Sequence, residues 1–187
     1  MLRRRTFAAV LLASPWLARA WAQESVEAPL QVQRDDRLLE LTYAIKLELP
    51  PTLADALQRG VALHFVAEAR VRRYRWYWRN AVVAEGERRW RLSYQPLTRQ
   101  YRVATSGGLS QSFDTLTDAL SVIRRASRWT LELREEPELG ASYDLEFSLR
   151  LDASQLPGPV QIGLGTRAAL EARESRPLHP MELGLAS

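Results

Sequence analysis

Apolar and polar residues alternate strictly along two long stretches of the chain. Between residues 39 and 49, apolar side chains occupy every odd position, and all but one of the even positions are polar. Residues 143–151 show the same pattern. Because successive side chains of a β-strand point to opposite faces, a period of two indicates a strand with one buried face. We therefore predict strands at Leu39–Leu49 and Tyr143–Leu151, each with its odd-numbered residues buried.

Shorter alternating segments predict further strands, joined by turns rich in proline, glycine and charged residues. These segments are 30–38, 61–69, 87–94 and 129–133, and a returning strand begins at Tyr101 after a tight connection at 95–98. Beyond Val71 the apolar series continues in the opposite phase, at Trp76 and Trp78. A β-bulge near Arg72 and Arg73 accounts for this change of phase.

Two short helices are predicted where the pattern Thr-Leu-x-Asp-Ala-Leu occurs, at residues 52–57 and 115–120. In each, we expect the threonine to cap the helix and the aspartate three residues later to complete a capping box. Gly60 ends the first helix, and the second extends to Arg125 with apolar residues at helical spacing. Together these elements predict a mostly β (α+β) fold, an antiparallel β-sandwich-like sheet with two short helices.

The first 22 residues have the features of a secretory signal peptide. Three arginines at positions 3–5 precede an apolar stretch at 6–18, and small residues then alternate at Ala18, Ala20 and Ala22. This apolar stretch is shorter than the roughly 20 residues that a spanning helix requires. We expect cleavage after Ala22 and a periplasmic or secreted protein, exported by general secretion or by the twin-arginine route. The alternative is an uncleaved signal segment, which would then supply the protein's only membrane contact.

Composition indicates how the chain is divided into segments and which ligands it is not expected to bind. We expect a signal peptide at 1–22, a single exported mostly β domain at 23–160, and a flexible C-terminal tail at 161–187, where glycine, proline, serine and arginine are frequent. Of the 26 basic residues, four lie in the first 22 positions, so the rest of the chain has 22 basic and 22 acidic residues. A neutral domain is not typical of nucleic-acid binding.

Catalytic and metal-binding motifs are absent from the sequence. The chain has no cysteine and two histidines far apart, which argues against thiol chemistry, disulfides and transition-metal sites. Nucleophile-elbow, phosphate-loop and dinucleotide-binding motifs do not occur. We therefore expect no catalytic residues, no metal and no cofactor. An enzyme that uses carboxylates distant in sequence is the least favoured of the functional alternatives.

The most unusual local composition runs from residue 70 to residue 79, where five arginines are interleaved with tyrosine and tryptophan. Guanidinium groups bind carboxylates and phosphates in pairs of hydrogen bonds, and aromatic rings stack on sugars. The candidate ligand- or partner-binding residues are Arg73, Arg75, Tyr77, Arg79, Arg99 and Arg102. The alternative is structural: Trp76 and Trp78 anchor the core, and the arginines form a solvated face paired with Glu68, Glu85 and Glu87.

Several motifs resemble a known bacterial family. They are D-A-L-x-x-G-V-x-L at 55–63, the Trp76-Tyr77-Trp78 cluster, L-S-Y-x-P-L-T-R-Q-Y-R-V at 92–103, and L-D-x-S-x-L-P-x-P-V-Q at 151–161. The chain resembles the domain-of-unknown-function family numbered 4390, which consists of small exported proteins. The resemblance implies export, a mostly β fold and genetic association with a membrane sensor kinase. It assigns no catalytic residue.

The leading functional hypothesis is a periplasmic binding or accessory protein, with a membrane or envelope protein, such as a sensor kinase, as its partner. The alternative is an envelope protein that binds an anionic glycan or lipid through the face formed by the arginine, tryptophan and tyrosine side chains.

Overall fold

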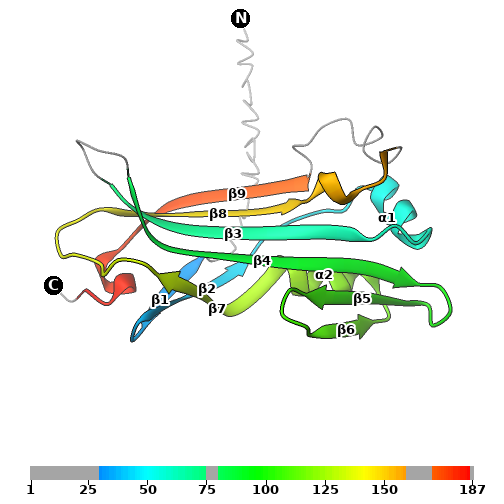
Figure 1. Cartoon of the computed structure of the whole chain (residues 1–187), viewed down its shortest axis with the longest axis horizontal. Coiled ribbons are helices and arrows are strands. Elements are labelled where there is room, and N and C mark those ends of the chain that lie inside the picture. The colour runs from blue at the N-terminus through cyan, green and yellow to red at the C-terminus, as the bar shows by residue number, and fades with distance from the viewer. Residues whose placement is uncertain (1–29, 75–79, 159–169, 186–187) are drawn as a thin grey trace, which may run out of the picture.

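The described part of the chain folds as one antiparallel β-sheet with two α-helices (Figure 1). The computed structural model describes residues 30–74, 80–158 and 170–185. The strands are β1 (Gln31–Asp35), β2 (Leu38–Ala44), β3 (Leu63–Arg73), β4 (Ala81–Gln95), β5 (Gln100–Thr105), β6 (Ser110–Phe113), β7 (Arg125–Leu133), β8 (Tyr143–Leu151) and β9 (Glu171–Leu178). The helices are α1 (Pro51–Gln58) and α2 (Leu116–Arg124), with short 3₁₀ turns η1 (Ala153–Gln155) and η3 (Pro180–Leu183).

The sheet has the strand order β1-β2-β7-β4-β3-β8-β9, and β5 and β6 extend it beside the second half of β4. It curls so that its two halves face each other across the interior. Tyr43 in β2 and Phe147 in β8 have ring centroids 4.6 Å apart, although three strands lie between β2 and β8 in the sheet. The predicted mostly β fold with two short helices is therefore confirmed, and its sandwich-like character comes from one curled sheet.

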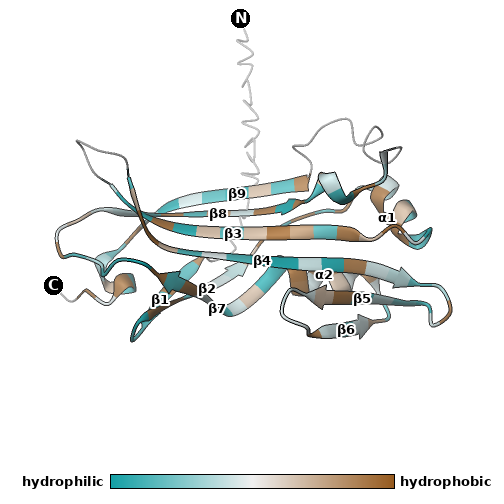
Figure 2. Ribbon diagram, viewed as in Figure 1, coloured by the Kyte–Doolittle hydropathy of each residue, from teal (hydrophilic) through white to brown (hydrophobic). Residues whose placement is uncertain are grey.

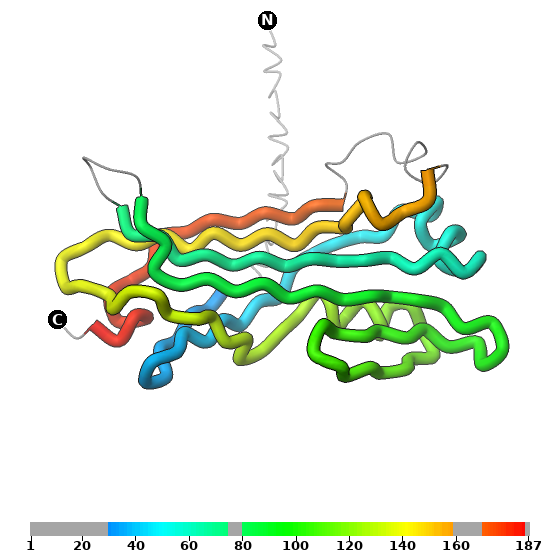
Figure 3. Tube along the Cα trace, viewed as in Figure 1, coloured from blue at the N-terminus to red at the C-terminus, as the bar shows by residue number. Residues whose placement is uncertain are grey.

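The two edges of the sheet meet at one end of the molecule. Figure 3 traces β1 and the C-terminal turn to this end. The Arg176 side chain, in β9, donates a hydrogen bond to the carbonyl of Leu30 (2.9 Å) and binds the Glu182 carboxylate (2.5 Å). From the other edge, the Arg34 side chain donates to the carbonyl of Leu183 (3.3 Å). These polar contacts hold the curled sheet closed without strand pairing between β1 and β9.

The core lies inside the curl and consists of the apolar residues that the alternating pattern singled out. The odd-numbered residues from Leu39 to Leu47 are buried, as are those from Tyr143 to Leu151. Figure 2 shows the corresponding alternation of apolar and polar colour along the strands. The predicted strand at 39–49 is shorter than expected, because β2 ends at Ala44, although burial continues to alternate beyond it.

The two predicted helix caps have different outcomes. Thr115 caps α2 as expected: its hydroxyl accepts the backbone N–H of Asp118 (3.1 Å). The cap predicted at Thr52 is wrong, because α1 already begins at Pro51, and no side chain caps it. Proline at the first helical position has the backbone angle that a helix needs, so the Pro50-Pro51 pair starts the helix before the threonine.

The predicted β-bulge lies beside Arg72, as expected, but its extra residue belongs to β4 and not to β3. Val71 pairs with Ala84 and Arg72 with Val82, which leaves Val83 of β4 as the extra residue. β3 itself keeps its phase to its end, so Arg73 continues the inward-facing series after Val71. The phase change expected at Arg73 is therefore wrong within β3.

The flexible tail predicted at 161–187 is also incorrect for the part that the structure describes. Residues 171–178 form β9, which pairs with β8 from Tyr143 to Arg150. The turn η3 then packs against β1, and its Leu183 is fully buried. The segment has a polar composition because an edge strand buries little of its own surface.

Candidate functional site

The residues predicted as a binding surface do not form one site in the part of the chain that the structure describes. Arg75, Tyr77 and Arg79 lie outside the described residues. Arg73 is the last residue of β3 and is 8 % exposed, and it binds Glu135 (2.9 Å) and Glu138. The hydrogen bond with Glu138, together with the charges of both carboxylates, raises the pKa of the Arg73 guanidinium against the effect of burial. Arg73 therefore ties β3 to the turn before β8.

The two other predicted residues are at the opposite end of the sheet (Figure 1). Arg99 lies in the exposed turn between β4 and β5, and Arg102 lies on β5, where it donates to the Ser110 hydroxyl (2.8 Å). The length of β4 separates this turn from Ala81, the partner of Arg73. At about 3.3 Å per residue, that is about 45 Å.

A different surface brings polar side chains together: the outer face of β3, β8 and β9. The register places Glu68 of β3 beside Ser148 of β8, and Ser148 beside Arg173 of β9. One step along, Arg70, Glu146 and Ser175 form a parallel row. Directly opposite residues of antiparallel strands share a face, so both rows point away from the core.

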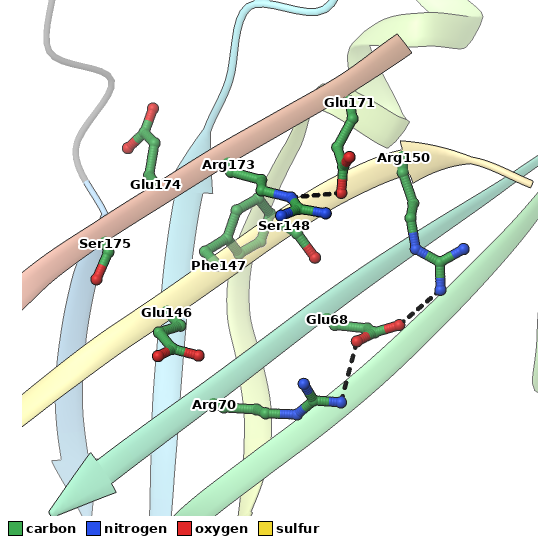
Figure 4. A pocket seen from close by; sticks show the side chains of 10 residues that line it. All are labelled: Glu68, Arg70, Glu146, Phe147, Ser148, Arg150, Glu171, Arg173, Glu174 and Ser175. Atoms are coloured by element: carbon green, nitrogen blue, oxygen red, sulfur yellow. Dashed lines mark hydrogen bonds and ion pairs between the residues drawn. The ribbon is translucent and has the colours of Figure 1, made fainter. Parts of the chain in front are cut away.

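These rows line an open groove of about 610 Å³ (Figure 4). We call it the outer groove. Its charged lining residues are Glu68, Arg70, Glu146, Arg150, Glu171, Arg173 and Glu174. Carboxylates and guanidinium groups are thus mixed over three strands, and neither sign of charge occupies the groove alone.

Ion pairs hold most of these side chains in place. The Glu68 carboxylate bridges two arginines, Arg70 (3.1 Å) and Arg150 (2.7 Å). Figure 4 shows this bridge and a separate pair between Arg173 and Glu171 (2.6 Å). The Glu68 side chain is 22 % exposed, whereas those of Arg70 and Arg150 are 44 % and 40 % exposed. The arginines are therefore fixed by a half-buried carboxylate but still present N–H donors to the solvent.

A smaller hollow lies beyond the end of the outer groove, between β3, β4, β5 and η1. It is lined by His64, Arg89, Arg91 and Asp152 among others. The hydroxyl of Ser154 donates a hydrogen bond that lowers the pKa of the Asp152 carboxyl below its usual range. This carboxylate caps the turn η1, so its first role is structural. The described residues contain no group of three histidine or acidic side chains arranged to hold a metal ion.

Comparison with known protein families identifies the family of the chain. A family model described as domain of unknown function (DUF4390) matches residues 22–173. The chain belongs to this family. The match confirms the resemblance on which export and a mostly β fold were expected. Searches of curated proteins and of solved structures find no match.

The DUF4390 match covers all of β3 and β8 and the first residues of β9. It therefore contains the whole of the outer groove except its last rim residues, Glu174 and Ser175. No helix among the described residues is long and apolar enough to cross a membrane.

Sequence reasoning found part of the outer groove and missed the rest. It proposed Glu68, Glu85 and Glu87 as partners of neighbouring arginines, and each makes such a pair: with Arg70 and Arg150, with Arg134, and with Arg89. It missed Glu171 and Arg173, because the tail lacks the apolar alternation that marks a strand. The available signal was the density of charged residues at 171, 173, 174 and 176, which is weak by itself.

Proposed function

We propose that this DUF4390 protein is an exported binding protein, an accessory to a membrane protein of the cell envelope, and that the outer groove contacts its partner. The N-terminal charge and hydropathy pattern supports export. The family match begins at residue 22, so residues 1–21 stand outside the matched domain, as a removable leader would. The genetic association that the family resemblance implies makes a membrane sensor kinase the first partner to test.

The observation that carries a binding role is the position of the outer groove. The interior of the curled sheet is filled by packed aromatic and aliphatic side chains, including Tyr43, Trp129 and Phe147. A hollow of about 610 Å³ instead lies open on the polar outer face. Small-molecule sites are mostly apolar and enclose most of their ligand, whereas an open and charged groove suits contact with another macromolecule.

The charges of the outer groove favour a protein partner over a polyanion. Four carboxylates line the groove together with three guanidinium groups. The carboxylates would repel a strongly anionic glycan or lipid surface. A protein surface with both acidic and basic side chains can instead pair with the carboxylates and with the guanidinium groups. We therefore assign the outer groove to a polypeptide partner, and not to the anionic glycan or lipid of the alternative hypothesis.

Site-specific photo-crosslinking in intact cells tests this proposal. Ser148 lies at the centre of the outer groove, and replacing it with a photoreactive residue adds no charge. We expect one dominant adduct with an envelope protein, identified by mass spectrometry. The control position is Thr130, an exposed residue on β7 outside the groove. Equal adducts from both positions, or no adduct from Ser148, would contradict the assignment of the groove.

Two arginine variants separate a specific contact from chance proximity. Arg150→Gln and Arg173→Gln remove donors that line the groove but bury no new charge. Each should reduce the yield of the Ser148 adduct several-fold, because charge-assisted hydrogen bonds across an interface contribute to its lifetime. The control Arg128→Gln removes an arginine of β7 that is as exposed as Arg173 (73 % against 75 %), and it should leave the yield unchanged.

Export is tested independently by sequencing the N-terminus of the protein recovered from the cell envelope. Cleavage after Ala22 would leave Gln23 as the first residue. A protein that retains residues 1–22 in the envelope would show an uncleaved anchor, and a protein found only in the cytoplasm would overturn the export proposal.

A further inference from the structure

A further charged hollow, of about 270 Å³, lies where α2 ends and β7 begins. Its polar lining residues are Lys46, Glu48, Thr117, Ser121, Arg124 and Arg125. We call this hollow the basic corner. It shares no lining residue with the outer groove, and its balance of charge is three cationic groups to one carboxylate.

The local fold explains why these side chains meet. Thr117, Ser121 and Arg124 are spaced at i, i+4 and i+7 on α2, so they lie along one side of the helix. Arg125 is the first residue of β7 and pairs with Ala44 at the end of β2. The backbone N–H of Ile45 donates to the carbonyl of Arg124 (2.8 Å), which holds the chain that carries Lys46 beside the helix end.

The cationic groups of the basic corner lack the partners that most arginines of the sheet possess. Among the described residues, Lys46, Arg124 and Arg125 form no ion pair, whereas every arginine that lines the outer groove does. The Nε atom of Arg124 is buried and has no hydrogen-bond acceptor in the described protein. Buried polar atoms in folded proteins are nearly always hydrogen-bonded, so no described group fully satisfies the Arg124 guanidinium, which also lines the basic corner.

We propose that the basic corner binds a phosphate group. A phosphate offers several acceptor oxygens and more than one negative charge, which fits two guanidinium groups and an ammonium group around a small hollow better than a single carboxylate does. The phosphate can belong to a lipid headgroup or to a soluble phosphate ester, and both sources present the same chemistry. This inference does not depend on a protein partner at the outer groove.

Titration of the full chain with inorganic phosphate tests the site, with chloride added to keep the ionic strength constant. The readout is the NMR signal of the Arg124 Nε–H group, which should shift in a saturable way. Lys46→Gln and Arg125→Gln should each weaken binding about tenfold, because each removes one charge-assisted contact. Lys46 is exposed, so its variant remains informative even where an arginine variant folds poorly.

The matched control is Arg37→Gln, which removes an exposed arginine from the turn between β1 and β2 that forms no ion pair with the described residues. It should leave phosphate affinity unchanged. A second arm measures sedimentation of the full chain with phosphatidylglycerol vesicles, with phosphatidylcholine vesicles as reference. If the protein binds phosphate and also binds the vesicles, and Lys46→Gln weakens the vesicle binding, the ligand is a lipid headgroup. If the protein binds phosphate but not the vesicles, the ligand is a soluble phosphate ester. No saturable phosphate binding, or an equal loss in Arg37→Gln, would overturn the proposal.

Discussion

The outer groove and the basic corner contain similar charged side chains, but these side chains are paired in the first region and unpaired among the described residues of the second. In the outer groove, three adjacent strands place arginine opposite or beside glutamate, and Glu68 binds two arginines at once. In the basic corner, where a helix changes into a strand, Lys46, Arg124 and Arg125 have no carboxylate within ion-pair distance among the described residues. Charged side chains in the first region thus fix one another in place and offer a partner only their remaining donors and acceptors, whereas the cationic groups of the second region have no described carboxylate to hold them.

The comparison shows that local richness in arginine is a poor guide to a binding site. The densest arginine run contains Arg73, and that guanidinium is buried and held by Glu135 and Glu138. The partners of a cationic group decide its role, and they are visible only when the strands are aligned. A paired arginine stabilises the fold or presents a fixed donor, and an unpaired one attracts an anion.

The largest effect should come from Gly86, where the two parts of the sheet diverge. β4 pairs with β7 only at Ala84 and Glu85, and a Cβ atom at residue 86 would lie 2.7 Å from the Leu131 side chain. Leu131 is fully buried, so Gly86→Ala should lower the free energy of unfolding by about 1–3 kcal/mol. Gly158→Ala, with open space around its Cβ position, is the control. Equal denaturation midpoints for the two variants would contradict this packing.

A smaller loss is expected for Glu68→Gln, which removes the carboxylate shared by two arginines of the outer groove. We expect a loss of about 1 kcal/mol in low salt that shrinks as salt is added, because partly exposed ion pairs are screened. The matched variant is Glu48→Gln, which removes the carboxylate of the basic corner. It should leave stability unchanged and strengthen phosphate binding. Chemical denaturation at two salt concentrations distinguishes the variants. An equal loss of unfolding free energy in Glu68→Gln and Glu48→Gln would contradict the difference in charge pairing between the two regions.

A pH-dependent contribution is expected from the contact that closes the sheet. Burial raises the pKa of the Glu182 carboxyl, but hydrogen bonds from Arg176 and the His179 backbone lower it by more, so it lies below its usual range. The carboxylate therefore stabilises the fold fully above its unfolded-state pKa, about 4.3, and this contribution is lost as the pH falls through the lower folded-state pKa. Denaturation curves of the wild type and Glu182→Gln should converge in acid. Parallel curves at all pH values would contradict the assignment.

The smallest change in stability is expected in the basic corner. Arg125→Gln removes no ion pair within the described residues, so the free energy of unfolding should change by less than about 0.5 kcal/mol. Thermal denaturation checks this value. A loss as large as that of Glu68→Gln would show that Arg125 has a structural partner.

Much of the fold follows from the sequence because its strands bury one face. The alternation at 143–151 gave β8 its correct bounds and its buried residues. Prediction failed where local signals compete or are missing. Thr52 has the same motif as Thr115, yet Pro51 starts α1 first. β9 is an edge strand with few buried residues, so no apolar period marked it.

The candidate sites were less predictable, because both depend on contacts between distant segments. Glu68 meets Arg150 across a strand pair that joins residues 82 positions apart. Lys46 and Arg125 line the same hollow only because β2 and β7 are neighbours in the sheet. Sequence reasoning can name charged residues, but the register of the strands decides which of them find partners.

The most direct test of this account measures both binding activities on the same two variants. Arg150→Gln should reduce the Ser148 photo-adduct several-fold and leave phosphate affinity unchanged. Arg125→Gln should weaken phosphate binding about tenfold and leave the adduct unchanged. Variants that impair both activities equally, or neither, would contradict the claim that the two regions recognise different partners.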